Sequence, residues 1–358
     1  MTGSNRNKRK WIIGTFAGVL VIICITVFVI YRNLNQLLTD ALYSNFQNSI
    51  ISDVYTLSFA NLQVNPFAGN IEVSDVRFTP KDSIPDEYAY ISGTIQLATD
   101  KLMLKNVNIR TLLRNKELVL SSIEIYRPVI ELIITGENYV FFPIIKSETE
   151  FYSNQKSMGL KVFGLNQFLL ADAQLHTWNK KADREFFIED LRIDIRSLLM
   201  DWNTGSSVVT NDFLQLSIGS ATGRLRQEPF AQFMFKDLAI EIDSFRMQNF
   251  VDTTMFAYHD FQTVISAVDA NTKDSIAHLT LDSLHVSYTG KSVELDNVQY
   301  KLNIPDAEMQ NKFTYQTAHF TGTIQQVKFY GFHFDSLLHS NQILMDSLVV
   351  KNMEASIY

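Results

Sequence analysis

The chain has 358 residues, of which 46% are hydrophobic, and it contains 26 Phe and 14 Tyr but only 14 Gly and 7 Pro. This composition excludes a disordered chain and is enough for one large folded body or two ordinary domains. The first 32 residues carry five basic and no acidic side chains, which leaves the remainder with 26 basic against 38 acidic residues, a net charge of −12. So acidic a body is a poor nucleic-acid binder.

The first predicted element is a membrane anchor. Residues 11–31 carry no charge, and as a helix they would span roughly 30 Å, the thickness of a bilayer core. Four basic residues lie in the tail 1–10, whereas only Arg32 follows directly, so the tail is expected in the cytoplasm and everything after residue 32 in the periplasm. A cleaved signal peptide fits less well, because the apolar core is long and no small-residue cleavage site follows. The chain is therefore expected to cross the inner membrane once.

A short helix is expected next, at residues 33–51. Leu38, Leu42 and Phe46 belong to an apolar stripe at helical spacing. The stripe needs a surface, which is either the membrane or the end of the domain. The only cysteine, Cys24, lies in the predicted anchor, so the outer part has no disulfide and relies on packing.

From residue 52 onward the sequence predicts strands whose alternation slips by one residue. In NIEVSDVRFTP, residues 70–80, Ile71 and Val73 alternate with polar residues, two polar residues follow, and alternation resumes at Val76 and Phe78. The same spacing recurs in seven further quartets: Leu102, Leu104, Val107 and Ile109; Leu118, Leu120, Ile123 and Ile125; Phe163, Leu165, Phe168 and Leu170; Phe233, Phe235, Leu238 and Ile240; Leu279, Leu281, Leu284 and Val286; Val293, Leu295, Val298 and Tyr300; Ile343, Met345, Leu348 and Val350.

Two geometries explain such a slip, a two-residue hairpin or a β-bulge inside one longer strand. The inserted pairs contain no glycine, although hairpin pairs favour it, so the bulge is the better interpretation. Repeated bulges would curve a sheet. We therefore predict a mostly β protein with one long, curved, antiparallel sheet that forms a groove, and a closed β-sandwich as the alternative.

An internal duplication is also predicted. The segment from Leu62 resembles the segment from Leu284 at an offset of 222, ISGTI at 91–95 resembles FTGTI at 320–324, and the segment from Leu112 resembles that from Leu337. The blocks suggest a first β-repeat over residues 52–275 and a second, incomplete one over 276–358.

These features resemble a known family. An anchor, a short helix and then VNPFAGNIEVSDVRF resemble the start of AsmA-like bacterial envelope proteins, and IEIYRPVIELIITGENYVFFPIIK and GLNQFLLADAQLHTWN resemble the blocks that follow. The resemblance covers residues 11 to about 200 directly. Through the kinship of that family with TamB-like and chorein-type bridge-like lipid transfer proteins, it implies a periplasmic, curved sheet with a lipid-holding groove.

No catalytic, metal or cofactor site is expected. TGKS at 289–292 lacks the first glycine of a phosphate-binding loop, the seven histidines show no metal-ligand spacing, and the only thiol lies in the predicted membrane span. Carboxylates recur at the slips, as Asp75, Asp190, Asp237, Asp282, Asp296 and Asp346, and are interpreted as a structural mark of the bulges.

The expected function is therefore binding or transfer of membrane phospholipid, with acyl chains on the apolar side of the sheet and no chemistry. The alternative is a non-catalytic scaffold that assists outer-membrane assembly through envelope protein partners. The candidate groove residues are Ile71, Val73, Val76, Phe78, Leu102, Leu104, Val107, Ile109, Leu284, Val293, Leu295, Val298 and Tyr300.

Overall fold

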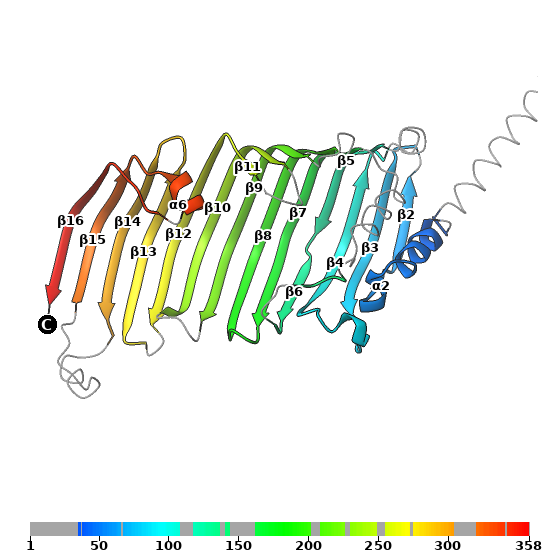
Figure 1. Ribbon diagram of the computed structural model, residues 1–358, viewed down its shortest axis with the longest axis horizontal. Coiled ribbons are helices and arrows are strands. Elements are labelled where there is room, and N and C mark those ends of the chain that lie inside the picture. Colours follow the sequence, from blue (N-terminus) through cyan, green and yellow to red (C-terminus); the bar gives the residue numbers. More distant parts are fainter. Residues whose placement is uncertain are drawn as a thin grey trace, which may run out of the picture.

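The computed structural model describes residues 35–36, 38–65, 67–107, 117–136, 140–143, 162–201, 208–225, 230–248, 255–272, 275–303, 320–340 and 342–357. Within this part, 16 strands form one sheet. Figure 1 shows the strands side by side, in nearly sequential order from the N-terminal end to the C-terminal end. The described part is thus mostly β, as predicted.

The first half of the sheet consists of β1 (Tyr55–Ser58), β2 (Asn61–Asn65), β3 (Asn70–Pro80), β4 (Gly93–Lys105), β5 (Glu117–Tyr126), β6 (Val129–Ile134), β7 (Val162–Asn179) and β8 (Arg184–Asp201). The second half consists of β9 (Val208–Leu225), β10 (Phe230–Gln248), β11 (Met255–Ala257), β12 (Asp260–Thr272), β13 (Ala277–Ser287), β14 (Ser292–Leu302), β15 (Phe320–Tyr330) and β16 (Ser347–Ile357).

The expectation of a purely antiparallel sheet is wrong at one place. β7 pairs in parallel with β5 and with β6, while every other recorded pairing of the described strands is antiparallel. A parallel partner requires the chain to return along the sheet before it pairs, which takes a dozen or more residues. The connection from residue 135 to residue 161 supplies that length, and its described piece, residues 140–143, passes from the start of β4 to the start of β1.

Helices are few in the described part. A helix covers residues 38–47 and is followed by α2 (Ile51–Val54), in agreement with the helix predicted at 33–51. Leu38 packs against the cluster of Leu62, Val64, Val73 and Val76, so the stripe of this helix lies on the end of the sheet. The short helices η1 (Asp86–Tyr88) and α6 (Phe334–Ser340) lie in connections.

The predicted anchor at residues 11–31 lies outside the described residues, as does the tail 1–10. No helix of the described part is long and apolar enough to cross a membrane. The single-pass topology stays a prediction.

The closed sandwich has no counterpart in the described part. All its strands belong to one sheet, and the two end strands of that sheet, β1 and β16, do not pair with each other. A sandwich would require a second sheet.

Most of the slipped quartets lie within single strands, as the bulge interpretation predicts. This holds for the quartets in β3, β5, β7, β10, β13 and β14. It fails at two places. β4 ends at Lys105, so Val107 follows the strand and Ile109 lies outside the described residues. Ile343 and Met345 lie in the connection between α6 and β16 instead of in a strand.

In three of these strands the slip has a backbone cause. One residue of the inserted pair in β3, β10 and β14, namely Asp75, Asp237 or Asn297, has a positive φ, a left-handed conformation that Asn and Asp tolerate better than other side chains. Other positive-φ residues lie on the same line across the sheet without belonging to the inserted pair of a quartet. The residues along this main line are Asp75, Arg127, Asp172, Asp190, Asp237, Ala267, Asn297 and Asn352.

The residues opposite these positive-φ residues on neighbouring strands lie at the same level of the sheet, although several of them, such as Asp100 and Asp282, have no positive φ. Arg127 Nε donates to Asp100 Oδ2 at 2.8 Å, and Asn297 Nδ2 donates to Asp282 Oδ2 at 2.8 Å. Because both neighbours carry the extra residue at the same level, the pairing register is unchanged across it, for instance from Ser74↔Lys101 to Val76↔Thr99. A simple bulge would shift the pairing register by one residue. Between β7 and β8 the register shifts by one residue and then shifts back, and between β10 and β12 it also shifts more than once. We call this line of interruptions, which crosses the whole sheet, the crease.

The duplicated segments pair partly alike. Val64↔Ile71 in the β2–β3 hairpin corresponds to Val286↔Val293 in the β13–β14 hairpin at the predicted offset. The block from Leu112 also fits, since Leu104↔Ile123 corresponds to Phe329↔Leu348. The middle block does not, because Gly93 pairs with Ile134 whereas Gly322 pairs with Tyr300 and Ala355. Both predicted repeats lie in the one sheet, and the division at residue 275 stays a prediction.

Candidate functional site: an apolar inner face

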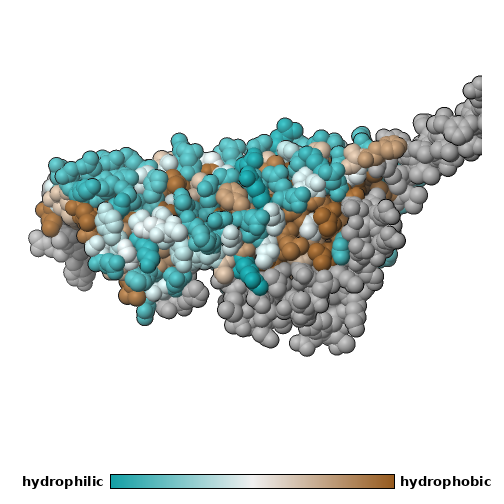
Figure 2. Space-filling view, turned by 90° about the horizontal axis from the view of Figure 1, so that it is seen from above, coloured by the Kyte–Doolittle hydropathy of each residue, from teal (hydrophilic) through white to brown (hydrophobic). Residues whose placement is uncertain are grey.

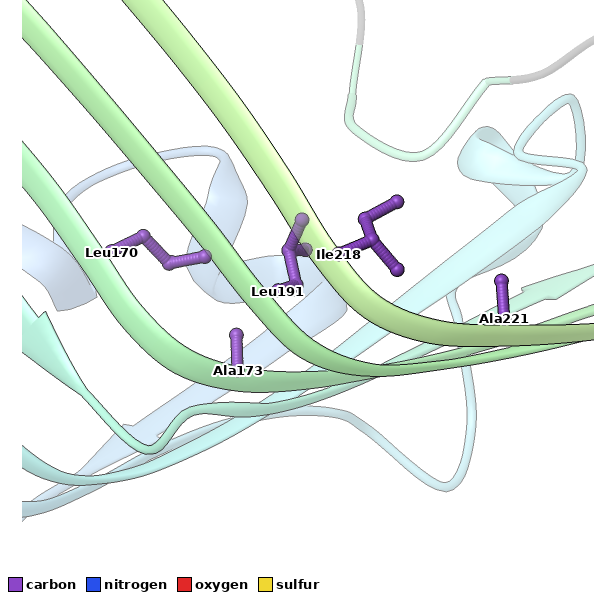
Figure 3. Packing of buried hydrophobic residues seen from close by; sticks show 5 residues of the cluster. All are labelled: Leu170, Ala173, Leu191, Ile218 and Ala221. Carbon is purple, nitrogen blue, oxygen red and sulfur yellow. The ribbon is translucent and has the colours of Figure 1, made fainter. Parts of the chain in front are cut away.

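The strands bend at the crease, and apolar side chains gather on the inside of the bend. Figure 3 shows Leu170, Ala173, Leu191, Ile218 and Ala221 projecting from the concave side of the bent strands. All five are buried, and Ala173 is completely inaccessible. We call this side of the sheet the inner face and the opposite side the outer face.

The pairing registers extend the inner face over the whole sheet, because residues that face each other on neighbouring strands project on the same side. One unbroken chain of partners, the upper row, crosses twelve strands from β3 to β16. Its members are Val73, Leu102, Ile125, Leu170, Ile193, Leu216, Ile240, Thr263, Val286, Val293, Phe329 and Leu348. Eleven of these residues are apolar and none is charged.

A second row, the central row, runs beside the crease; where the recorded pairs skip a position, its members follow from the adjoining pairs of the same strands. Its members are Val76, Thr99, Pro128, Ala173, Leu191, Ile218, Leu238, Ile265, Leu284, Leu295, Val327 and Val350. Its one polar member is buried Thr99, whose hydroxyl donates to the carbonyl of Tyr126 at 2.8 Å. Burying that hydroxyl therefore leaves no unpaired polar group.

Exposure changes along the central row. From Val76 in β3 to Ile218 in β9 every member is buried, from Leu238 to Val327 the members are half-buried, and Val350 in β16 is 43% exposed. All 11 residues of β16 are exposed, including Leu348 and Met353 of the inner face. The inner face is thus covered toward the N-terminal end and accessible toward the C-terminal end.

Part of the cover at the N-terminal end is an aromatic cluster. The ring of Tyr55 stacks on Phe78 with centroids 4.5 Å apart, and Phe142 lies 5.7 Å from Tyr55 and 6.5 Å from Phe78. The hydroxyl of Tyr55 donates to the carbonyl of Phe141 at 2.6 Å, and the amides of Ser92 and Gly93 donate to the carbonyl of Val140. These bonds hold the crossing segment, residues 140–143. Burial raises the pKa of that hydroxyl, with the backbone amide of Ile95 acting in the opposite direction. The tyrosine stays neutral and remains a donor.

Hydrophobic residues reach the surface toward both ends of the molecule. Seen from above, hydrophilic residues line the long edge of the molecule, while hydrophobic residues gather in one patch toward the N-terminal end and in another at the C-terminal end (Figure 2). The second patch agrees with the exposure of Leu348, Val350, Met353 and Ile357 in β16.

The outer face carries polar side chains that form hydrogen bonds with one another. Glu124, whose side chain is 8% exposed, accepts hydrogen bonds from Lys105 Nζ at 2.6 Å and from the hydroxyls of Ser122 and Tyr126 at 2.8 Å. Burial alone would raise the pKa of Glu124, but the bonds from Lys105, Tyr126 and Ser122 together lower it below its ordinary value. Glu124 is therefore a carboxylate held by three donors.

A polar ladder continues over the outer face of β13 to β16. Asp296 accepts from the hydroxyl of Ser283 at 2.8 Å and from Gln326 at 3.0 Å, and Gln326 in turn accepts from Lys351 at 2.7 Å. The hydrogen bonds from Ser283 and Gln326 lower the pKa of Asp296. Charges thus gather on the face opposite the apolar rows.

Eleven of the thirteen predicted groove residues lie at inner-face positions, in facing pairs or rows. Val73, Leu102 and Val293 belong to the upper row, and Val76, Leu284 and Leu295 belong to the central row. Ile71 faces Leu104 above them, and Val298 and Tyr300 lie below. Phe78 is also on this side but belongs to the aromatic cluster, so protein side chains cover it. Val107 follows β4 and Ile109 lies outside the described residues.

Sequence reasoning missed the crossing segment and the three-donor site of Glu124. The string YVFFPII signalled an apolar stretch, but no local pattern says that it crosses to Tyr55. Among the described residues, no three His, Cys, Asp or Glu side chains are placed to hold a metal ion. His176 and His278 instead lie 3.0 Å from Glu185 and 2.9 Å from Asp269 on neighbouring strands.

The chain matches no protein-family model, and it matches no curated protein.

Proposed function

We propose that this protein is a membrane-anchored lipid-binding protein of the AsmA-like envelope class, and that the inner face holds the acyl chains of membrane phospholipids in a groove. The observation that carries the proposal is the uncovered half of the central row. Leu238, Ile265, Leu284, Leu295 and Val327 are only half-buried, although each is apolar and each faces apolar partners.

So many partly exposed apolar side chains indicate that an apolar ligand or partner covers them. Burying one Leu, Ile or Val side chain is worth roughly 1.5–3 kcal/mol, and contiguous apolar surface of this kind marks a binding site. An acyl chain suits the rows because it is long, flexible and apolar and asks for no hydrogen bond. The two rows contain no charged residue, and charged side chains concentrate on the outer face instead. Both observations support an apolar occupant.

The bend supports the same proposal. A flat sheet would present a plane, whereas strands that turn at a common level surround an elongated occupant from two sides (Figure 3). Left-handed residues such as Asp237, Asn297 and Asn352 continue the crease as far as β16, so this shape extends beyond the buried half.

The test is the lipid content of the purified full chain. The protein is extracted from membranes, and its bound phospholipid is measured by mass spectrometry after extensive washing, with a β-rich anchored protein that lacks an apolar face as the control. Stoichiometric phospholipid is the expected result. A washed, folded protein without lipid would favour the alternative, a scaffold that binds envelope proteins.

A further inference from the structure

Phe67 is an exposed aromatic side chain in the connection between β2 and β3. Its side chain is 84% exposed, the largest value among the large hydrophobic side chains of the described part. It belongs to neither apolar row, since it lies in a turn rather than a strand. A single exposed hydrophobic residue is common on protein surfaces, so what distinguishes this ring is where it lies and how its turn is held.

The turn around Phe67 is held firmly. The side-chain oxygen of Asn65 accepts from the amides of Phe67 at 3.2 Å and Ala68 at 3.1 Å. Gly69 has a φ of +65°, and its carbonyl accepts from the amide of Val107 at 2.8 Å. A Cβ at Gly69 would lie 3.2 Å from the backbone of Val107, a tight contact, and the positive φ also favours glycine here. The turn therefore presents Phe67 in a fixed place.

The base of the turn is bonded to the helix that leads to the predicted anchor. The amide of Val64 donates to the side-chain oxygen of Asn35 at 2.9 Å. The predicted anchor ends at Tyr31, four residues before Asn35, and four residues reach at most about 14 Å. Phe67 is three residues beyond Val64. The ring thus lies within reach of the bilayer surface that the anchor would occupy.

The corresponding turn of the β13–β14 hairpin provides a comparison. At the offset of 222, Phe67 corresponds to Thr289 and Gly69 to Lys291, which also has a positive φ. The hydroxyl of Thr289 donates to Asp260 at 3.1 Å. The two turns share their backbone conformation at this position, but the one far from the anchor carries a polar residue and the one near it carries Phe.

We propose that Phe67 inserts into the interface of the bilayer that holds the anchor, and that it fixes the N-terminal end of the sheet against that membrane. Aromatic rings favour the level of the lipid headgroups, where a single ring on a rigid turn adds a second attachment point. This inference rests on the anchor of the proposed function, but not on lipid in the groove.

The experiment places an environment-sensitive fluorophore on single cysteines of the full chain in bilayer nanodiscs with brominated phospholipids as quenchers. Ala68→Cys, in a Cys24→Ser background, reports on the turn and keeps Phe67. Thr289→Cys is the matched control in the other turn, and the native Cys24 reports on the anchor itself. The label at Ala68 is expected to be quenched several-fold more than the label at Thr289, and Phe67→Ser is expected to abolish the difference.

Any one of four results would overturn the proposal. The first is equal quenching of the labels at Ala68 and Thr289, and the second is quenching at Ala68 that survives Phe67→Ser. The third is a label at Ala68 that is shielded from aqueous iodide but is not quenched by lipid, which would indicate a protein contact. A label at Cys24 that lipid does not quench would refute the anchor and this inference with it. Detergent-solubilised protein loaded with brominated lipid serves as a control, since insertion requires a bilayer and quenching by lipid in the groove does not. Because Phe67 is exposed, the unfolding of Phe67→Ser in circular dichroism should match wild type.

Discussion

Asn297 donates a hydrogen bond from Nδ2 to Oδ2 of Asp282 at 2.8 Å, across the point where the crease passes from β14 to β13. Asn297 has a φ of 51°, whereas Asp282 does not have a positive φ. The same arrangement of a left-handed residue bonded to its neighbour joins Arg127 to Asp100 and Asn352 to Gln325. The crease is therefore a line of positions at which one residue takes a left-handed backbone conformation, and in these examples a polar side chain bonds it to the neighbouring strand.

Replacing Asn297 tests this origin of the bend. Asn297→Ala and Asn297→Gly both remove the bond to Asp282, but only alanine has a Cβ that disfavours the left-handed conformation. The free energy of unfolding is expected to be lower for Asn297→Ala than for Asn297→Gly by about 1–2 kcal/mol. Chemical unfolding followed by circular dichroism measures the difference, and equal values would show that the backbone at this position is not strained.

A carboxylate on the inner face should act differently at its two ends. Val76 is buried in the cluster with Leu62, Val64 and Val73, so Val76→Asp should destabilise the fold by several kcal/mol. Val298 is half-buried and keeps access to water, so Val298→Asp should fold but lose bound phospholipid. Thermal unfolding and lipid content are measured together. If Val298→Asp unfolds as readily as Val76→Asp, the C-terminal half of the inner face is closed.

The hydroxyl of Tyr55 is one attachment of the crossing segment, and the hydrogen bonds between Val140 and Ser92 and Gly93 are another. Tyr55→Phe removes the donor to the carbonyl of Phe141 and keeps the ring stack with Phe78. We expect a loss of about 1 kcal/mol in stability, because a neutral hydrogen bond contributes roughly 0.5–1.5 kcal/mol. Hydrogen exchange at the amides of residues 140–142 should become faster, whereas Tyr330→Phe at the far end should leave it unchanged. Unaltered exchange in Tyr55→Phe would mean that other contacts hold the segment.

Glu124 should make the stability depend on acid pH. Its folded pKa is lowered, so the carboxylate stabilises the fold above the ordinary value of 4.5, and this contribution is lost as the pH falls through the folded pKa. Glu124→Gln should reduce stability at neutral pH and flatten the acid limb of the curve of stability against pH. Glu117→Gln, on the same strand, serves as the control. An acid limb that keeps its slope in Glu124→Gln would rule out this group as its source.

Local pattern was sufficient for part of the fold. The spacing of Val73 and Val76 around Ser74 and Asp75 predicted that both valines project on one side, and both are buried on the inner face. This succeeded because a left-handed residue changes the side-chain period within a single strand. The recurrence of Asp and Asn at the slips was also visible, and these are the residues that tolerate the required φ.

The sequence pattern did not predict features that depend on the pairing of distant segments. That Asp75 faces Asp100 depends on the register between β3 and β4, which the slipped alternation of β3 alone does not fix. The parallel pairing of β7 depends on where a long connection brings the chain back, and the segment before β16 was misassigned because Ile343 and Met345 have strand-like spacing in a loop. The candidate site was predictable to the same extent. The sequence pattern predicted which residues of each strand lie on the apolar side, but it did not predict the aromatic side chains that cover Phe78.

The most direct test of the central claim is photo-crosslinking of lipid to neighbouring positions of one strand. A photoreactive amino acid is placed at Leu295, on the inner face, or at Glu294, on the outer face, and the full chain is irradiated in native membranes. The account predicts phospholipid adducts at Leu295 and none at Glu294, as detected by mass spectrometry of the purified protein. Equal adducts at both positions, or none at Leu295 in a folded protein, would contradict it.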